Sequence, residues 1–167
     1  IVTKDPPTRA WANAKGTPLL GLSDTLAATL RGTPGDYLFS IGNHVVLDDD
    51  LLAAPRQAAL NFHYGPLPSF AGVHAPVWAI LEGQSRYGVT WHEMSTGVDA
   101  GRIVARLAFD VAADETAAGL NARCFEAGVA SFRALLSDIS TDTLRFDAQD
   151  PSARRVFRRH QRPEGFG

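Results

Sequence analysis

Apolar residues along this chain cluster into short blocks that are separated by turns containing proline and glycine. The blocks YLFSI at 37–41 and AALNF at 58–62 are short and flanked by turn residues, which is typical of buried strands. Between them, LDDDLLAAP at 47–55 places acidic residues at the start of a short helix, where the helix dipole favours them. Two apolar strands around a helix form a βαβ unit, so we expect a largely parallel sheet.

The N-terminal region carries weaker signals. IVTK at 1–4 resembles the end of a strand, and we expect the following DPPT to be a loop because Pro6 and Pro7 cannot continue a strand ladder. Ser23 is a candidate N-cap for a helix over TLAATLR, which the TPG at 33–35 would end.

The second half of the chain alternates between helical and strand patterns. VHAPVWAILEG at 73–83 predicts a helix, with proline in its first turn and glycine at its end. YGVTWHEM at 87–94 and RIVARLAFDV at 102–111 predict strands, and their short glycine-containing link favours a hairpin or a bulged turn. Apolar positions at helical spacing then run to Leu136, behind a cap at Asp114 or Thr116.

Composition narrows the class of protein. The chain has 167 residues, of which 45% are hydrophobic and 20% charged, as in an ordinary globular protein. Its formal charge of −2 creates no basic field for nucleic acid, so we expect no nucleic-acid partner. A lone cysteine, Cys124, and the lack of an apolar run long enough for a bilayer favour a cytoplasmic protein without membrane contact. We expect a catalytic domain at 1–140 and an extension or linker at 141–167.

Candidate chemistry lies at the end of the second predicted strand. Alternation places Asn61 and His63 on one side of this strand, with Phe62 facing away. An amide can donate to a developing oxyanion, and an imidazole can pass a proton near neutral pH, so the pair suits acyl transfer. The best-placed acidic partner is Asp99, in the glycine-flanked loop STGVDAG.

These residues stand in an order that resembles the formyltransferases that use 10-formyltetrahydrofolate. The matching features are Asn61–Phe62–His63, Leu67–Pro68 followed by Gly72, a helix ending in AILEG, then GVTWHEM and GVDAG. The ordered set runs from about Tyr37 to Ile103, and weaker similarity continues through 116–137. The resemblance implies a Rossmann-like α/β fold, 10-formyltetrahydrofolate as co-substrate and an amine as acceptor.

The same resemblance assigns roles to particular residues. It implies that Asn61 stabilises the tetrahedral intermediate, that His63 polarises the formyl group or protonates the departing folate nitrogen, and that Asp99 orients His63 and takes the proton of the amine. It also implies that two backbone segments hold the pterin ring. Their residues are Asn43, His44, Val45 and Leu47, with Thr96, Gly97 and Val98.

Some positions depart from the common family pattern. Tyr64, Gly65 and Pro66 follow the histidine, and this version is similar to formyltransferase domains attached to nonribosomal peptide synthetases. It favours an amino acid, free or on a carrier protein, as the acceptor. Arg102 replaces a common acidic residue. The family's first strand and helix have no counterpart, so we expect the fold to lack them.

Other interpretations stay open at this stage. A formyltetrahydrofolate hydrolase would use the same three residues with water as acceptor, and a non-catalytic folate-binding or interaction module of a larger synthetase would not need them all. His44, His74 and His92 lack the spacing of a metal site, so we expect no metal. No GxGxxG motif follows a strand, which argues against a dinucleotide dehydrogenase.

Overall fold

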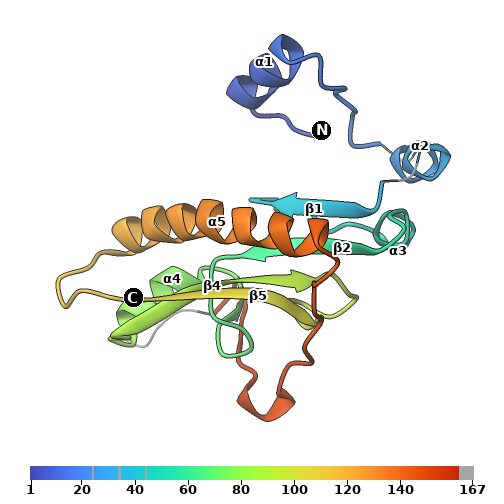
Figure 1. The fold of residues 1–167 in the computed structure, drawn as a ribbon. Helices are drawn as coiled ribbons and strands as arrows, with labels where there is room; N and C mark the ends of the chain where they lie inside the picture. Colours follow the sequence, from blue (N-terminus) through green and yellow to red (C-terminus); the bar gives the residue numbers. More distant parts are fainter. Residues whose placement is uncertain (24, 34, 44, 162–167) are drawn as a thin grey trace. The chain divides into compact units, whose positions relative to one another are not determined.

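The computed structural model describes residues 1–23, 25–33, 35–43 and 45–161, and its elements are labelled in Figure 1. The chain divides into two compact units. The first consists of residues 1–38 and 46–58, and the second of residues 39–45 together with the chain from residue 59 onward. None of the described helices is both long and apolar enough to cross a membrane.

The first unit contains α1 (Pro6–Ala14), α2 (Leu26–Gly32) and α3 (Asp49–Leu52). The prediction of a loop over DPPT is wrong, because α1 begins within it. Proline is tolerated in the first turn of a helix, where its missing N–H would have no partner, and Asp5 caps this turn by accepting from the Thr8 amide at 2.8 Å. Helices α2 and α3 pack around buried Leu26, Ala27 and Leu51.

Four strands form the main sheet, in the order β1–β2–β4–β5. They are β1 (Tyr37–Ile41), β2 (Ala58–His63), β4 (Arg86–Glu93) and β5 (Ile103–Asp110), and each corresponds to a predicted strand. Strands β1 and β2 run in the same direction, as the βαβ pattern predicts (Figure 1). The α/β class is therefore confirmed by the arrangement of the elements.

The other two pairings of this sheet are antiparallel, and the one between β2 and β4 departs from the predicted parallel arrangement. Strand β4 is antiparallel to β2, with His63 opposite Thr90 and Leu60 opposite Glu93, and β5 is antiparallel to β4. The reason lies in the connection after β2: the chain enters β4 at the carboxyl end of β2, so no crossover is needed. The predicted hairpin between 87–94 and 102–111 accounts for the second antiparallel pair.

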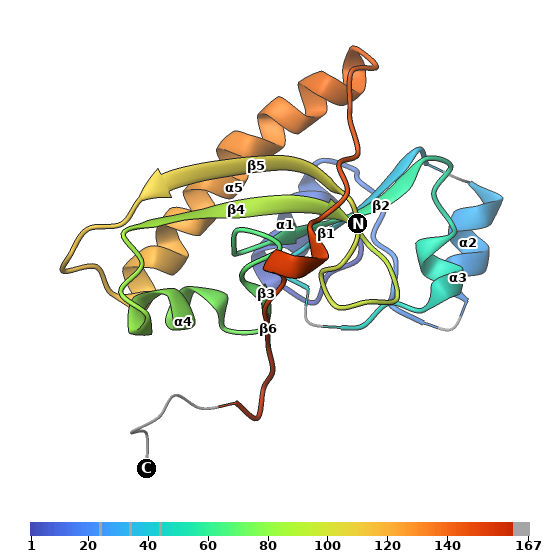
Figure 2. The same cartoon turned by 90° about the horizontal axis from the view of Figure 1, so that it is seen from below.

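The long helix α5 (Ala117–Ser140) covers one face of this sheet (Figures 1 and 2). Its N-cap is Thr116, whose hydroxyl accepts from the Gly119 amide at 3.0 Å. Beneath it, Trp91 is 1% exposed and its indole N–H donates to the Ser131 hydroxyl at 3.0 Å. Burying an aromatic side chain of this size contributes roughly 1.5–3 kcal/mol, so this face is the core of the second unit.

Helix α4 (Ala75–Leu81) contacts α5, and a separate two-stranded sheet pairs β3 (Ala71–Gly72) with β6 (Val156–Phe157) in parallel. After α5 the chain returns past the start of β5 and reaches β3, with a 3-10 turn at Pro151–Ala153 on the way (Figure 2). The segment predicted as an extension thus contributes a strand to the second unit. The predicted boundary at residue 140 stays a prediction.

Candidate functional site

Asn61 and His63 project from the face of the sheet that lies opposite α5. Antiparallel pairing puts Asn61 beside His92 and His63 beside Thr90, and directly paired residues share a face. Phe62 and Trp91 form the corresponding pair on the α5 face, with their ring centroids 4.9 Å apart. The predicted strand alternation is therefore present, and it collects four polar side chains on one surface.

Asp99 reaches this surface from the loop between β4 and β5. Its Oδ2 lies 3.5 Å from His63 Nδ1, and its Oδ1 lies 3.4 Å from His92 Nε2. The Gly72 amide donates to Oδ2 at 2.7 Å, which ties the carboxylate to β3. Asp99 has a φ of 46°, a left-handed conformation that aspartate tolerates better than most residues. The three residues that the sequence nominates thus converge, although 61 and 99 are far apart in the chain.

His63 is buried and has a defined hydrogen-bonding state. Its Nε2–H donates to the Phe70 carbonyl at 2.6 Å, because a carbonyl oxygen can only accept. Nδ1 is therefore the nitrogen that faces Asp99. Burial lowers the pKa of His63 below its usual value, and this outweighs the opposing influence of the Asp99 charge and of the Phe70 carbonyl. In the folded protein at neutral pH the imidazole is neutral.

This lowered pKa predicts how stability changes with pH. In the unfolded chain His63 has the ordinary histidine pKa of about 6.5, whereas in the folded chain its pKa is lower. The stability that neutral His63 contributes is fully present above the unfolded-state pKa. It is lost as the pH falls below that pKa and through the lower folded-state pKa. We expect the melting temperature to drop more steeply between pH 7.5 and 5.5 in the wild type than in His63→Gln.

Glutamine at this position keeps a donor for the Phe70 carbonyl but does not titrate. His160→Gln is the matched control, since His160 is exposed. Scanning calorimetry at several pH values measures the difference. If His63→Gln follows the wild-type profile, His63 is not the group that is held neutral.

Asp99 is ionised in the folded state. Burial alone would raise its pKa, but the neighbouring His92 and His63 rings and the Gly72 amide outweigh burial and lower the pKa below its usual value. At neutral pH Asp99 is therefore in its proton-accepting form, and it lies beside two imidazoles. The site therefore pairs a neutral imidazole with an anionic base.

His92 belongs to the site as well, although the sequence marks it only as a satisfied polar position. It is 3% exposed, and its Nδ1–H donates to the Glu93 carbonyl at 2.8 Å. Its Nε2 lies 3.2 Å from Asn61 Nδ2 and 3.4 Å from Asp99 Oδ1, so it links the amide to the carboxylate and leaves one N–H of Asn61 available. The signal that could have identified it is its position opposite Asn61, which depends on the strand register.

The loop after His63 is fixed by the sheet below it. Thr90 Oγ1 donates to the Gly65 carbonyl at 2.8 Å and accepts from the Leu67 amide at 3.1 Å. A Cβ on Gly65 would lie 2.9 Å from both His63 Nε2 and the Phe70 carbonyl oxygen, so only glycine leaves that hydrogen bond intact.

The residues predicted to hold the pterin ring are placed as follows. Thr96, Gly97 and Val98 form the exposed loop that leads to Asp99, and Val98 is 59% exposed. Asn43 and Val45 follow β1 in the second unit, where the Asn43 side chain donates to and accepts from the Val45 backbone.

The two other residues predicted to contact the pterin ring are Leu47 and His44. Leu47 lies in the first unit, where it packs against the cluster of Leu26 and Leu51. His44 lies outside the described residues. A role in cofactor binding stays a prediction for all seven residues.

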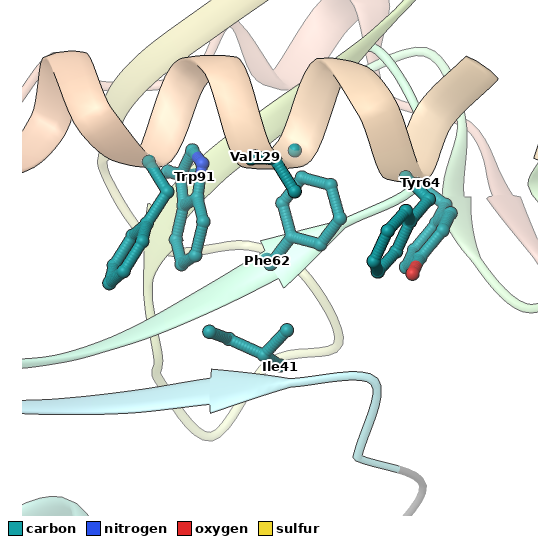
Figure 3. Close-up of a pocket in the computed structure, with 8 residues that line it drawn as sticks. Ile41, Phe62, Tyr64, Trp91 and Val129 are labelled. Carbon is teal, nitrogen blue, oxygen red and sulfur yellow. The ribbon is translucent and has the colours of Figure 1, made fainter. Parts of the chain in front are cut away.

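An apolar pocket lies on the other face of the sheet, between α5 and the strands (Figure 3). Phe62, Trp91 and Val129 line it, and so do Ile41, Tyr64, Phe125, Gly128 and Phe132. Its lining is apolar apart from the Tyr64 phenol, whose pKa is raised by burial, so the polar face is the better candidate for the active site. In the part of the chain that the structure describes, no group of three His, Cys, Asp or Glu residues could hold a metal ion.

The sequence matches a known class of protein. The model of the formyl transferase family matches residues 2–136. The chain therefore belongs to the formyl transferase family, which confirms the resemblance noted in the sequence.

Curated relatives include methionyl-tRNA formyltransferases. The one from Anaeromyxobacter dehalogenans (strain 2CP-1 / ATCC BAA-258) is 36% identical over 124 residues, which cover 72% of this chain and 40% of that protein. The one from strain 2CP-C is 30% identical over 166 residues, which cover 97% of this chain and 53% of that protein. The chain thus spans about half the length of these relatives or less.

Solved structures confirm the formyltransferase fold. An N-formyltransferase from Helicobacter canadensis, in complex with folinic acid and dTDP-3-aminofucose, has a TM-score of 0.76 at 21% identity, over 90% of this chain and 53% of that chain. Glycinamide ribonucleotide transformylase 1 from Symbiobacterium toebii also gives 0.76, at 23% identity, over 89% of this chain and 79% of that chain. At these identities the likeness concerns the fold alone.

Proposed function

We propose that this chain carries the catalytic site of an enzyme that transfers a formyl group from 10-formyltetrahydrofolate to an amine. The observation that carries the proposal is the convergence of an amide, a neutral imidazole and an ionised carboxylate at Asn61, His63 and Asp99. Membership of the formyl transferase family supports it. So do the fold neighbours whose structures contain folinic acid, 5-N-formyl-tetrahydrofolate or tetrahydrofolic acid.

In the proposed reaction, the amine nitrogen attacks the formyl carbon and a new C–N bond forms. Negative charge then develops on the formyl oxygen, and Asn61 donates its remaining N–H to this oxyanion. Asp99 accepts the proton of the amine, directly or through one water. The bond to the folate nitrogen breaks, and His63 Nδ1, which faces Asp99, relays the proton to that nitrogen. The reaction needs no metal and no covalent enzyme intermediate.

The folate would bind beside the exposed loop that precedes Asp99. We assign Thr96, Gly97 and Val98 to this contact, with Asn43 and Val45 of the same unit. The resemblance adds His44 and Leu47 to the residues proposed for folate binding. An exposed valine next to a buried charged site provides apolar surface for a flat ring, and the loop backbone provides hydrogen bonds.

For the acceptor we propose an amino acid, free or attached to a carrier protein, as in nonribosomal peptide biosynthesis. The support is the sequence Tyr64–Gly65–Pro66 and the change to Arg102. Arg102 donates to both Glu93 oxygens, at 2.8 and 2.9 Å, so its charge is matched by a carboxylate on β4. The named activities of relatives concern methionyl-tRNA, sugars and glycinamide ribonucleotide, and a screen should include such amines.

Titration calorimetry with folinic acid tests the folate assignment. We expect micromolar binding by the wild type and clearly weaker binding by Val98→Asp, which places a charge where the ring would lie. Val129→Asp makes the same change on α5, across the sheet from Asn61, and should bind normally.

The outcomes separate the proposed functions. Binding followed by formyl transfer to an amine supports the proposal. Binding with release of formate alone would instead indicate a hydrolase, and binding without either reaction would indicate a non-catalytic module. If folinic acid does not bind, the folate assignment is wrong.

A further inference from the structure

The segment Asp147–Phe157, here called the C-terminal strap, contacts both loops that form the candidate site. Its first residue pairs with Ile103 at the start of β5 through two backbone hydrogen bonds of 2.7 and 2.8 Å. Its last residues form β6, which pairs with β3, and the Arg155 amide donates to the Pro68 carbonyl at 3.1 Å. The strap therefore spans from the Asp99 loop to the loop that follows His63.

Gln149 makes the most specific contact in this strap. Its side-chain Nε2 donates to the carbonyl of Asp99 at 2.8 Å and to the carbonyl of Gly101 at 2.7 Å. Both N–H groups of one amide are thus used on the two carbonyls that flank residue 100. The orientation is unambiguous, because the flipped amide would place its oxygen against two acceptors.

The Asp99 loop needs this support for a physical reason. Asp99 is held in a left-handed conformation, and the loop before it is exposed, so the loop has little packing of its own. A second contact comes from Arg154, whose Nη2 donates to the Val98 carbonyl. Three backbone carbonyls of the loop, those of Val98, Asp99 and Gly101, therefore accept hydrogen bonds from side chains of the strap.

We propose that Gln149 is a positioning residue for Asp99. By holding the backbone on both sides of residue 100, Gln149 keeps the Asp99 carboxylate against the Gly72 amide and the two imidazoles. The strap is then part of the active site. This inference rests on the proposed function for its meaning in catalysis, but the geometry that it concerns can be measured without any substrate.

The Gly72 amide reports directly on the Asp99 carboxylate. It donates to Asp99 Oδ2, whereas the amides on either side of it donate to the strap: Ala71 to the Arg155 carbonyl and Val73 to the Phe157 carbonyl, both at 3.0 Å. Hydrogen exchange at these three neighbouring amides therefore separates movement of the carboxylate from release of the whole strap.

The test is native-state hydrogen exchange by NMR in Gln149→Leu, which keeps the volume of the side chain and removes both donors. We expect the Gly72 amide to exchange about tenfold faster or more, while Ala71 and Val73 change much less. Gln84→Leu, which makes the same change after α4, should leave all three amides as in the wild type. Gln149→Asn, too short to reach both carbonyls, serves if the leucine variant does not fold.

An unchanged Gly72 amide would overturn the proposal. Equal acceleration of all three amides would also overturn it, because Gln149 would then only stabilise the strap. The hydrogen-exchange rates are measured without folate. A failure to bind folinic acid would therefore count against the proposed function, whereas the positioning role of Gln149 is decided by the exchange rates alone.

Discussion

Asp99→Asn is expected to lower the rate of formyl transfer by about 10²–10⁴-fold while the protein stays folded. Asparagine has nearly the same shape, accepts a hydrogen bond from the Gly72 amide as aspartate does, and tolerates the left-handed conformation at φ 46°. What it cannot do is take a proton from the attacking amine. The loss should therefore appear in kcat, and binding of folinic acid should change little.

The rate would be measured as release of tetrahydrofolate from 10-formyltetrahydrofolate with the best amine found in a screen. Asp110→Asn removes the same charge from the exposed end of β5 and should have near wild-type activity. Activity within a few-fold of wild type in Asp99→Asn would exclude Asp99 as the base and leave His63 or water for that role.

Local patterns predict most elements of this fold because their signals lie within a few residues. The βαβ unit, the helix before Gly83 and the cap at Thr116 all follow from short-range rules, and the structure contains each of them. Helix α1 was mispredicted, because two prolines indicate a loop unless the capping role of Asp5 is recognised, and the short strands β3 and β6 were not predicted. The direction of β4 relative to β2 was mispredicted for a different reason: it depends on which end of the sheet the chain returns to, which the sequence does not encode locally.

The residues of the candidate site also fall into two groups: those that local patterns predict and those that depend on the tertiary structure. Asn61 and His63 are predictable because alternation along one strand puts them on one face. Asp99 could be nominated from its glycine-flanked loop, but its role required the resemblance to a family, since no local pattern brings residue 99 next to residue 63. His92 and Gln149 were not predicted, because their roles follow from strand register and from a segment that returns about 50 positions later in the chain.

Asn61→Ala is expected to lower the rate of formyl transfer by about 10²–10³-fold, the usual cost of removing one donor to an oxyanion. Alanine removes the N–H that would meet the formyl oxygen and also frees His92 Nε2 from its hydrogen bond at 3.2 Å. Because Asn61 lies at the surface of the site and is only partly buried, stability should fall by about 1 kcal/mol or less, as for an ordinary lost hydrogen bond.

The same measurement of tetrahydrofolate release tests this prediction, with Asn121→Ala on the exposed side of α5 as the matched control. An interaction that forms mainly in the transition state lowers kcat and leaves KM nearly unchanged. If Asn61→Ala raises KM and leaves kcat at the wild-type level, Asn61 binds the donor rather than the oxyanion, and another N–H near His63 must stabilise the intermediate.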